Sequence, residues 1–299
     1  MALATIRFDT NGDVKVSEPA SVFIGGFTPV NCDYSYESLL EKERVISAGA
    51  SGICHWVQGR DFTLVECSQE VSELESISDV ASQFYETLLN LIPTLDHQNL
   101  VRFWNCVPYI NCGDGDREVY KQFCSGRLAG FQMADITDYQ FPAASALGHK
   151  SQRLTTHMLL SRFDVEHHEN PLQINAFEYP PQYGKSSPSF ARATQVFTSN
   201  QKPMLFVSGT ASIRGHETLH LGDVSAQTTL SIDNIEVLLK QANKVTDDIS
   251  SLRVYIRNAD DVPVVMAMVN DRMPKGSRSF LHADICRSDL LVEIECIAQ

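Results

Sequence analysis

The stretch DLLVEIE, residues 289–295, decides how this chain of 299 residues folds. Its last residues alternate between apolar and acidic, and a period of two is typical of a β-strand. Successive side chains of a strand point to opposite faces, so Glu293 and Glu295 share one face while Val292 and Ile294 share the other. We therefore expect this strand to contact an apolar core with one face and to present two carboxyl groups on the other.

Similar elements precede this strand along the chain. In the second half, apolar runs predict strands at residues 172–179, 204–208 and 252–256, and a helix at residues 234–245 with an apolar stripe of Ile235, Leu238, Leu239 and Ala242. The first half shows the same order, with strands at residues 21–24, 53–57, 62–67 and 99–110 and helices at residues 69–92 and 117–127. Strand, strand, helix, strand in each half predicts an α+β fold, in which helices pack on one face of mixed sheets.

The chain length predicts two domains of ordinary size, each with its own core. In this interpretation residues 1–150 form the first domain and residues 151–299 form the second. The two halves share no letter-by-letter repeat, so a duplication is inferred from the order of elements alone. The stretch FPAASALG at residues 141–148 is rich in small side chains. It is either a linker between the domains or the lining of a cleft.

The composition excludes some partners. A net charge of −13 and a pI near 5.1 argue against a general nucleic-acid or anionic-membrane surface, because phosphate groups are bound mainly by Lys and Arg. Any anionic ligand must therefore be held by a local cluster of arginines. The first residues show no basic region followed by an apolar core, and no run approaches the ~18 apolar residues of a spanning helix. We expect a cytoplasmic protein without a membrane or nucleic-acid partner.

The eight cysteines show no C-x-x-C pair and no regular spacing. Neither a zinc knuckle nor a thioredoxin-type redox site is indicated, and we expect most of these cysteines to be reduced and buried.

A stretch that resembles a zinc-protease motif has the wrong context. GHETLH, residues 215–220, contains an H-E-x-x-H string, which binds zinc when a helix brings its two histidines to one face. An apolar, β-branched run precedes it and a glycine-containing turn follows, so no such helix is expected. On an extended chain His216 and His220 would lie about 13 Å apart, at roughly 3.3 Å per residue. We expect a polar loop that binds no metal, with a zinc hydrolase as the alternative.

Several motifs, read in order, resemble one enzyme family. The ending HADICRSDLLVEIECIA, residues 282–298, is similar to the last strand of the YjgF/Rid superfamily, which has an arginine fifteen residues before the first glutamate, as Arg278 stands before Glu293. Six earlier motifs resemble the chorismatases, a family of Rid-like domains: FWNCVPYIN at 103–111, YKQFCSGR at 120–127, FPAASALG at 141–148, EYPPQYG at 178–184, PSFARA at 188–193 and SGTASI at 208–213. The likeness extends from about residue 99 to the end and is weaker before it. It implies two Rid-like domains around one cleft, the first of them degenerate, and no cofactor.

Chorismatases cleave pyruvate from chorismate, and the resemblance therefore implies a need for an acid. Chorismate carries an enolpyruvyl ether, whose cleavage without a metal requires a proton on the vinylic methylene. Glu293 is our candidate for this acid, provided that burial raises its pKa; otherwise it is a solvated residue of an edge strand.

The substrate is a dianion, and arginine supplies rigid, always-charged donors for its carboxylates. We nominate Arg192 and Arg278 for this role, with the alternative that each is structural. Tyr183 follows two prolines and is expected to donate a hydrogen bond to the substrate. Gly209, Thr210 and Ala211 are expected to offer backbone N–H groups at a tight turn.

The resemblance also indicates a product. Relatives that form 3-hydroxybenzoate carry Cys seven residues before the catalytic glutamate, and Cys286 has that position. A side chain there can determine whether water or the ring hydroxyl attacks the activated ether carbon. We therefore expect pyruvate and 3-hydroxybenzoate as products. The alternatives are a hydrolase that forms a dihydroxycyclohexadiene carboxylate, and a Rid-like binding protein without turnover. A monomer is expected, because two Rid-like halves can satisfy each other's interfaces, and a trimer is the alternative.

Overall fold

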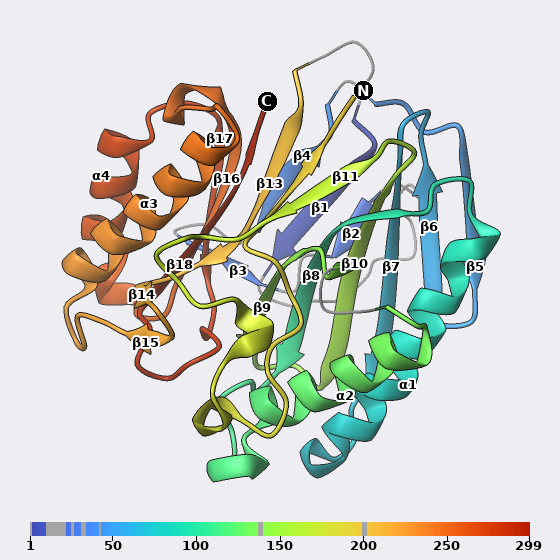
Figure 1. Ribbon diagram of the computed structural model, residues 1–299, viewed down its shortest axis with the longest axis horizontal. Coiled ribbons are helices and arrows are strands. Elements are labelled where there is room, and N and C mark those ends of the chain that lie inside the picture. Colours follow the sequence, from blue (N-terminus) through green and yellow to red (C-terminus); the bar gives the residue numbers. More distant parts are fainter. Residues whose placement is uncertain are drawn as a thin grey trace.

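The computed structural model describes residues 2–9, 22–24, 27–30, 34–41, 43–136, 140–198 and 202–299. These residues form two large mixed sheets, each covered on its outer face by a pair of helices (Figure 1). The α+β architecture expected from the order of elements is confirmed.

The first sheet has six strands in the order β5-β6-β7-β10-β8-β9. Their bounds are β5 (Ser47–Ser51), β6 (Cys54–Gln58), β7 (Phe62–Glu70), β8 (Asn99–Pro108), β9 (Ala143–His149) and β10 (Arg153–Ser161). All neighbours are antiparallel except β8 and β9, which run parallel and are joined through a helix. The predicted strand at residues 99–110 is confirmed as β8, which has a neighbour on each side.

Two helices cover the outer face of this sheet, α1 (Ile77–Leu91) and α2 (Val119–Met133). They approach each other closely because α2 has glycines at the contact: a Cβ on Gly130 would lie 2.4 Å from the Cβ of Tyr85. Tyr85 stands in a group of aromatic rings with Phe103, Phe123 and Phe131, with centroid distances of 5.6, 6.2 and 5.6 Å. This aromatic group is the centre of the first core.

The second sheet has seven strands in the order β11-β12-β13-β18-β16-β17-β3. Their bounds are β3 (Thr28–Pro29), β11 (Val165–His168), β12 (Ala193–Val196), β13 (Met204–Thr210), β16 (Ile249–Ile256), β17 (Ser277–His282) and β18 (Val292–Ala298). The strand predicted from DLLVEIE is β18, and it lies in the middle of the sheet. Val292, Ile294 and Cys296 on its outer face pack under α3 (Val224–Gln241) and α4 (Val262–Arg272).

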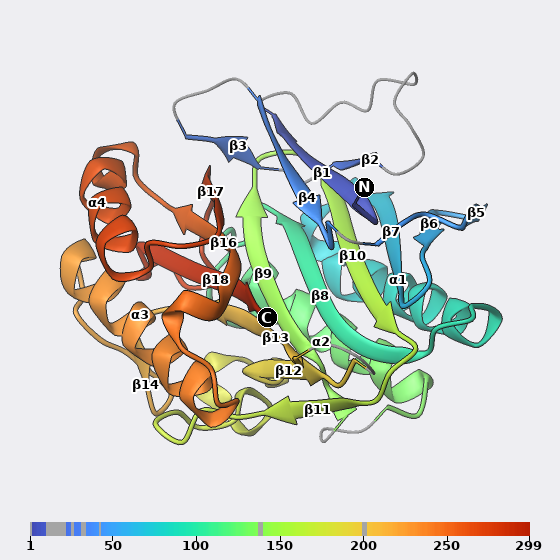
Figure 2. The same cartoon turned by 90° about the horizontal axis from the view of Figure 1, so that it is seen from above.

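The inner faces of the two sheets pack against each other, with the helices outside (Figure 2). Trp104 from β8, Phe206 from β13 and Tyr255 from β16 belong to the core between the sheets. A small third sheet in the order β2-β1-β4, with β1 (Ala4–Asp9), β2 (Val22–Ile24) and β4 (Tyr34–Leu39), contributes Ile6 and Phe8 to the same core. Glu293 and Glu295 therefore point into the region between the sheets, as their alternation with apolar residues predicted.

Some expected elements differ from the structure. Residues 172–179 form no strand but a loop with a single bridge between Gln173 and Gly215 and a 3₁₀ turn at Ala176–Glu178, and two prolines follow this turn. The helix expected at residues 69–92 begins only at Ile77, since Gln69 and Glu70 still pair with β10. The helix expected at residues 234–245 begins ten residues earlier, where Asp223 accepts a hydrogen bond from the Ala226 N–H. Residues 141–148 are not a linker but mostly the strand β9, and none of them lines the cavity of about 560 Å³ beside the second sheet.

The division between the halves follows the strand pairing. Strand β10 lies after residue 150 but pairs with β7 and β8 of the first sheet. We therefore propose that the division falls after Ser161 and not near residue 150. The second sheet also takes β3 from the N-terminal part of the chain, so the halves are not separate in sequence.

Cys54 and Cys67 face each other across β6 and β7 and form a disulfide. The expectation that most cysteines are reduced still holds for the described ones, since Cys106, Cys112, Cys124, Cys286 and Cys296 form no disulfide. In the described parts of the chain, no helix is long and apolar enough to cross a membrane.

Candidate active site

A cavity of about 560 Å³ opens beside the middle of the second sheet. It is lined by β13, by β18, by the segment that leads into β18, by the start of α2 and by the segment before β12. Its lining includes six of the residues singled out in the sequence, namely Tyr183, Arg192, Gly209, Ala211, Cys286 and Glu293. The motifs at residues 120–127, 178–184, 188–193 and 208–213 and the C-terminal motif therefore converge on one pocket, whereas the motifs at 103–111 and 141–148 contribute no residue to its lining.

Glu293 is the buried carboxyl group of this pocket. Its residue surface is only 4 % exposed, and no described residue donates a hydrogen bond to it. Burial raises the pKa of Glu293 to about 8, the negative charge of Glu295 adds to this increase, and Arg102 and Arg192 oppose it. At neutral pH the side chain is thus a protonated acid that faces a cavity, which is the state required for proton delivery.

Gly209 makes room for this acid. A Cβ at Gly209 would lie 1.9 Å from the Glu293 Oε1 atom, a separation that no real contact allows. The pairing of β13 with β18 is interrupted between Val207 and Thr210, and this irregularity lets the backbone pass close to the carboxyl group. Gly209 is therefore needed for close approach and not, as we expected, for a tight turn.

Thr210 and Ala211 follow with different roles. Ala211 lines the pocket, whereas Thr210 does not. The hydroxyl group of Thr210 donates to the Ser208 carbonyl at 2.8 Å, so its side chain serves the local backbone.

Arg192 is the arginine of the cavity wall whose charge acts on Glu293, with a smaller effect than that of Arg102. Its residue surface is 5 % exposed, and its Nη2 atom donates to the Ile174 carbonyl at 3.0 Å and to the Tyr179 hydroxyl at 2.8 Å. The guanidinium also stacks on the rings of Phe190 and Tyr179, at 5.1 and 5.6 Å from their centroids. These contacts hold the group rigidly at the cavity wall, which favours specific recognition of a carboxylate.

Glu169 stands behind Arg192. Its Oε2 atom lies 4.0 Å from Arg192 Nε, and neither atom has a hydrogen-bond partner. Burial raises the pKa of Glu169 to about 7, against the lowering effect of Arg192, and Glu178 adds to the increase. Glu169 and Arg192 thus form a long contact, and the charge of Glu169 changes near neutral pH.

A second arginine, Arg287, lines the pocket and was not among our candidates. It lies over the Tyr183 ring at 4.0 Å and over the Tyr179 ring at 5.4 Å. Its Nη1 atom donates to the His216 carbonyl at 2.9 Å and to the Thr218 hydroxyl at 3.2 Å. The sequence signal was its position directly after Cys286, but nothing in the sequence indicates that it folds back over Tyr183.

Tyr183 itself is held at the pocket by this arginine and by a histidine. Its hydroxyl group lies 3.1 Å from His216 Nδ1, within hydrogen-bond distance. The polar end of the ring is therefore already oriented from one side, and the same hydroxyl remains at the cavity wall.

Arg278 is not at the pocket, contrary to our expectation. It pairs with Leu252 of β16, which pairs in turn with Cys296 of β18, and these side chains lie on the outer, helix-covered face of the sheet. The Arg278 guanidinium donates to the Met273 carbonyl at 3.1 Å, at the end of α4. The spacing of fifteen residues did not reveal the error, because spacing alone does not determine the face of a neighbouring strand.

Cys286 lines the pocket. It also packs against two hydrophobic cores, the one between the sheets and the one between the first sheet and its helices. Burial raises the pKa of its thiol to about 12, and the nearby Glu293 carboxyl contributes to the increase. At neutral pH Cys286 is therefore a neutral thiol and not a nucleophilic thiolate.

GHETLH forms a hairpin and not a helix. The short strands β14 (Ile213–Arg214) and β15 (Glu217–Thr218) pair with each other, with Gly215 between them at φ 58°. His216 contacts Tyr183, and His220 is at a left-handed turn with φ 59°. Among the residues that the structure describes, no group of three or more His, Cys, Asp or Glu side chains is arranged to hold a metal ion.

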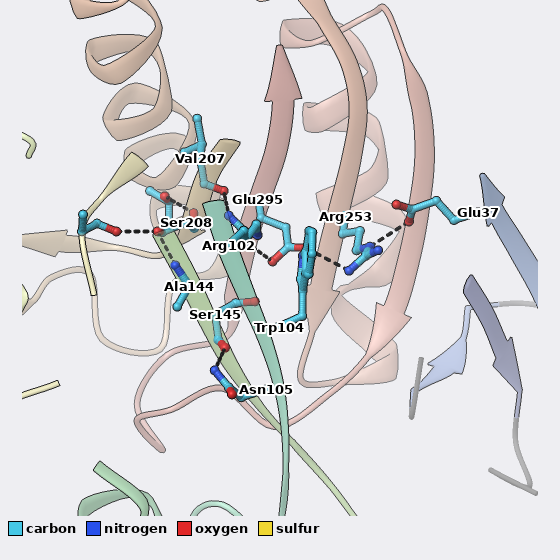
Figure 3. Close-up of polar contacts among 12 residues, drawn as sticks. Glu37, Arg102, Trp104, Asn105, Ala144, Ser145, Val207, Ser208, Arg253 and Glu295 are labelled. Atoms are coloured by element: carbon cyan, nitrogen blue, oxygen red, sulfur yellow. Dashed lines mark hydrogen bonds and ion pairs between the residues drawn. The ribbon is translucent and has the colours of Figure 1, made fainter. Parts of the chain in front are cut away.

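A buried ionic network lies beneath the pocket, between the sheets (Figure 3). Glu295 accepts hydrogen bonds from Arg102 at 2.7 Å, from the Trp104 indole at 2.8 Å and from Arg253 at 3.3 Å. Arg253 also donates to Glu37 of β4 at 2.8 Å. Arg102 donates in addition to the Val207 carbonyl, directly before the irregular part of β13. The network therefore joins the first sheet, the second sheet and the small third sheet.

Fold and pocket together define an α+β protein of two packed halves, with one buried carboxylic acid in a cavity lined by arginine and tyrosine. Two family models match the chain: "Chorismatase FkbO/Hyg5-like, N-terminal" at residues 38–160 and "Endoribonuclease L-PSP" at residues 186–299. These matches cover both halves that the sheet pairing defines.

Curated relatives agree with these matches. A 3-hydroxybenzoate synthase of Streptomyces hygroscopicus is 34% identical over 244 residues, which is 77% of this chain and 72% of the relative. A chorismatase of Streptomyces rapamycinicus is 37% identical over 224 residues, 71% of this chain and 67% of the relative. A crystal structure of a chorismatase superposes with a TM-score of 0.86 at 27% identity and covers 99% of this chain and 92% of that one. The chain belongs to the chorismatase family.

Proposed function

We propose that this protein cleaves the enolpyruvyl ether of chorismate and releases pyruvate and 3-hydroxybenzoate. The observation that carries the proposal is Glu293, a protonated carboxylic acid with a pKa of about 8 that faces a cavity with two arginines on its wall. The relatives named 3-hydroxybenzoate synthase and chorismatase support the same chemistry.

In the first step Glu293 transfers its proton to the vinylic methylene of the ether. This makes a methyl group and leaves an oxocarbenium-like carbon, whose positive charge is stabilised by the carboxylate that Glu293 has become. The burial of Glu293 supports this first step, because a desolvated carboxyl group with a raised pKa still carries a proton to donate near neutral pH.

The two carboxylates of chorismate require two cationic contacts. We assign one to Arg192, which lies close enough to Glu293 for its charge to act on that acid. The other is assigned to Arg287, which the stacked Tyr183 ring holds farther along the wall. Tyr183 then donates a hydrogen bond to the same region of the substrate.

Cys286 supports the aromatic product over the dihydrodiol. In the aromatic route the ring hydroxyl adds to the oxocarbenium carbon and returns its proton to the Glu293 carboxylate. The bond between the ring carbon and that same oxygen then breaks, and the neighbouring ring carbon loses its proton to the departing oxygen, which makes the ring aromatic. The hemiketal that remains collapses to pyruvate and a phenol. No water is consumed, and the two products have together the composition of chorismate. A neutral, weakly polar thiol beside the reacting carbon offers little anchorage to a competing water molecule, unlike a strongly hydrogen-bonding side chain.

The test is to incubate the purified protein with chorismate and to measure pyruvate and the ring product by chromatography. Glu293→Gln keeps the shape of the acid but removes its proton, and we expect turnover to fall by at least about 100-fold while chorismate still binds. Glu217→Gln is the matched control, since Glu217 also lines the pocket but lies exposed in β15. It should retain activity.

The other outcomes are informative. Pyruvate together with a non-aromatic diol would retain the family activity and exclude the role proposed for Cys286. Binding of chorismate without pyruvate release, and with no effect of Glu293→Gln, would indicate a binding protein and would contradict the proposed function.

A further inference from the structure

Glu295 is two residues beyond Glu293 on β18 and lies on the same inner face of the strand. Its residue surface is 3 % exposed. Oε2 accepts from Arg102 Nη2 at 2.7 Å, and Oε1 accepts from Trp104 Nε1 at 2.8 Å and from Arg253 Nη1 at 3.3 Å (Figure 3). Both carboxylate oxygens of Glu295 are therefore occupied by N–H donors, two of which belong to positively charged guanidinium groups.

Glu293 has the opposite environment. No described residue donates to its carboxyl group, while Glu295 lies beside it on the strand. Burial of the Glu293 carboxyl group and the neighbouring charge of Glu295 both raise the pKa of Glu293 and favour its protonated form. This is the protonation state that the proposed acid requires.

We propose that Glu295 is a positioning residue for the reaction, whose fixed negative charge adds to the effect of burial in keeping the proton on Glu293. The inference rests on the proposed function of Glu293 as the acid. Glu295 does not contact the cavity, so it acts through Glu293 and not on the substrate.

The other charged groups near Glu293 do not replace this contribution. Arg102 and Arg192 favour the ionised form of Glu293, and Cys286 is a neutral thiol, so Glu295 is the negative charge that works in the required direction. Arg102 belongs to the same network and also donates to the Val207 carbonyl of β13. Loss of the network could therefore act by charge or by geometry, and the test has to separate the two.

The test is a pH titration of carboxyl groups in the ligand-free protein by infrared difference spectroscopy, which separates protonated acids from carboxylates. Glu293→Gln identifies the Glu293 band. In the wild-type protein this band is expected to persist as an acid up to about pH 8. A Glu293 band that is already ionised at neutral pH in the wild-type protein would overturn the proposal.

Glu295→Gln removes the charge and keeps the size. We expect the Glu293 band to titrate at least about one pH unit lower, which is about a tenfold loss of the acid form on the alkaline side. The alkaline limb of kcat against pH should move by the same amount. Glu295→Asp keeps the charge and should restore most of the effect.

The matched control is Glu37→Gln, the same change at the other carboxylate of the network. Glu37 contacts Arg253 and Ser279 and has no resolved effect on Glu293. We expect its Glu293 titration to stay in place even if the protein is less stable. An unchanged titration in Glu295→Gln, or an equal displacement in Glu37→Gln, would overturn the proposal. If the wild-type protein does not cleave chorismate, the proposed function fails, while the titration still decides this inference.

Discussion

At the scale of single residues, the pocket depends on one close contact between a glycine and an acid. Gly209 gives up a side chain so that Glu293 can occupy the space beside β13. Burial is the largest cause of the raised pKa of this carboxyl group. Gly209 thus provides room for an acid whose pKa is raised by its burial.

Gly209→Ala should reduce turnover strongly, because the new Cβ would occupy the position of Glu293 Oε1 and displace the acid. We expect kcat to fall by at least about 100-fold. Gly52→Ala is the control: Gly52 has φ 57° and nothing within 4 Å of an added Cβ, so this change strains the backbone without touching the site. It should lower the melting temperature and leave kcat unchanged. A Gly209→Ala protein with normal kcat would contradict the steric argument.

The affinity for a dianion should depend on Glu169. Ionised Glu169 is a negative charge 4.0 Å from Arg192, whose orientation is already set by Ile174 and Tyr179. As pH rises through about 7, Glu169 loses its proton, and KM for chorismate should increase several-fold. Glu169→Gln should abolish this increase, whereas Glu166→Gln, a change of an exposed residue on β11, should not. An unaltered pH dependence of KM in Glu169→Gln would contradict this expectation.

Glu293 should also affect stability. Its pKa is raised from 4.5 to about 8, so its contribution to the free energy of unfolding is fully present below pH 4.5 and is lost as pH rises through 8. The loss amounts to at most about 1.4 kcal/mol per pH unit over this interval. Urea unfolding at several pH values should show that Glu293→Gln removes this decline and becomes relatively more stable at high pH. A parallel decline in both proteins would exclude Glu293 as its source.

The residues of the pocket could be predicted where the motif itself forms the wall. Gly209 comes from a motif in β13, which pairs directly with β18, Arg192 comes from the motif that leads into β12, and the alternation of DLLVEIE placed Glu293 on the correct face. The prediction that Arg278 lies at the pocket was wrong, because its spacing to Glu293 does not determine which face of β17 it occupies. Arg287 was missed because its place depends on a stacking contact with Tyr183, more than a hundred residues earlier in the sequence.

At the scale of elements, periodicity identified the long helices and the strands with clear alternation. It failed where tertiary pairing overrides local pattern. The small residues of FPAASALG form β9 because β8 pairs with them in parallel. The local sequence pattern does not predict this pairing. The apolar residues Leu172 and Ile174 form no strand, since both remain largely exposed in a loop.

The contact between α1 and α2 offers a test at this scale. A Cβ at Gly130 would meet the Cβ of Tyr85 at 2.4 Å, so Gly130→Ala should force the helices apart despite its gain in helix propensity. We expect a net destabilisation of about 1–3 kcal/mol in urea unfolding, typical of an overpacked core. Gly115→Ala, in an open turn before α2, is the comparison at a site without such a neighbour. A stabilised Gly130→Ala protein would show that the helix pair can adjust.

At the scale of the whole molecule, the two sheets share a core and an ionic network. Glu37 of β4, Arg102 of β8, Arg253 of β16 and Glu295 of β18 come from three sheets and depend on each other for charge compensation. Removal of any one partner would leave a buried charge, which is costly. The halves are therefore not independent in energy, although each has its own helices.

This sharing predicts a single unfolding transition. Differential scanning calorimetry should give one peak whose calorimetric and van't Hoff enthalpies agree. The first half expressed alone, ending after Ser161, would expose residues such as Trp104 and Phe62 and should bind a hydrophobic dye or aggregate. Two separate peaks in the intact protein would contradict the shared core.

The position of β18 has a consequence for synthesis. This strand follows every other strand along the chain, yet it lies between β13 and β16 in the middle of the second sheet. Until β18 has been synthesised, the edges of β13 and β16 that it pairs with remain unpaired and exposed. The same insertion brings Glu293 into the pocket, so the candidate acid is in place only after the second sheet is complete.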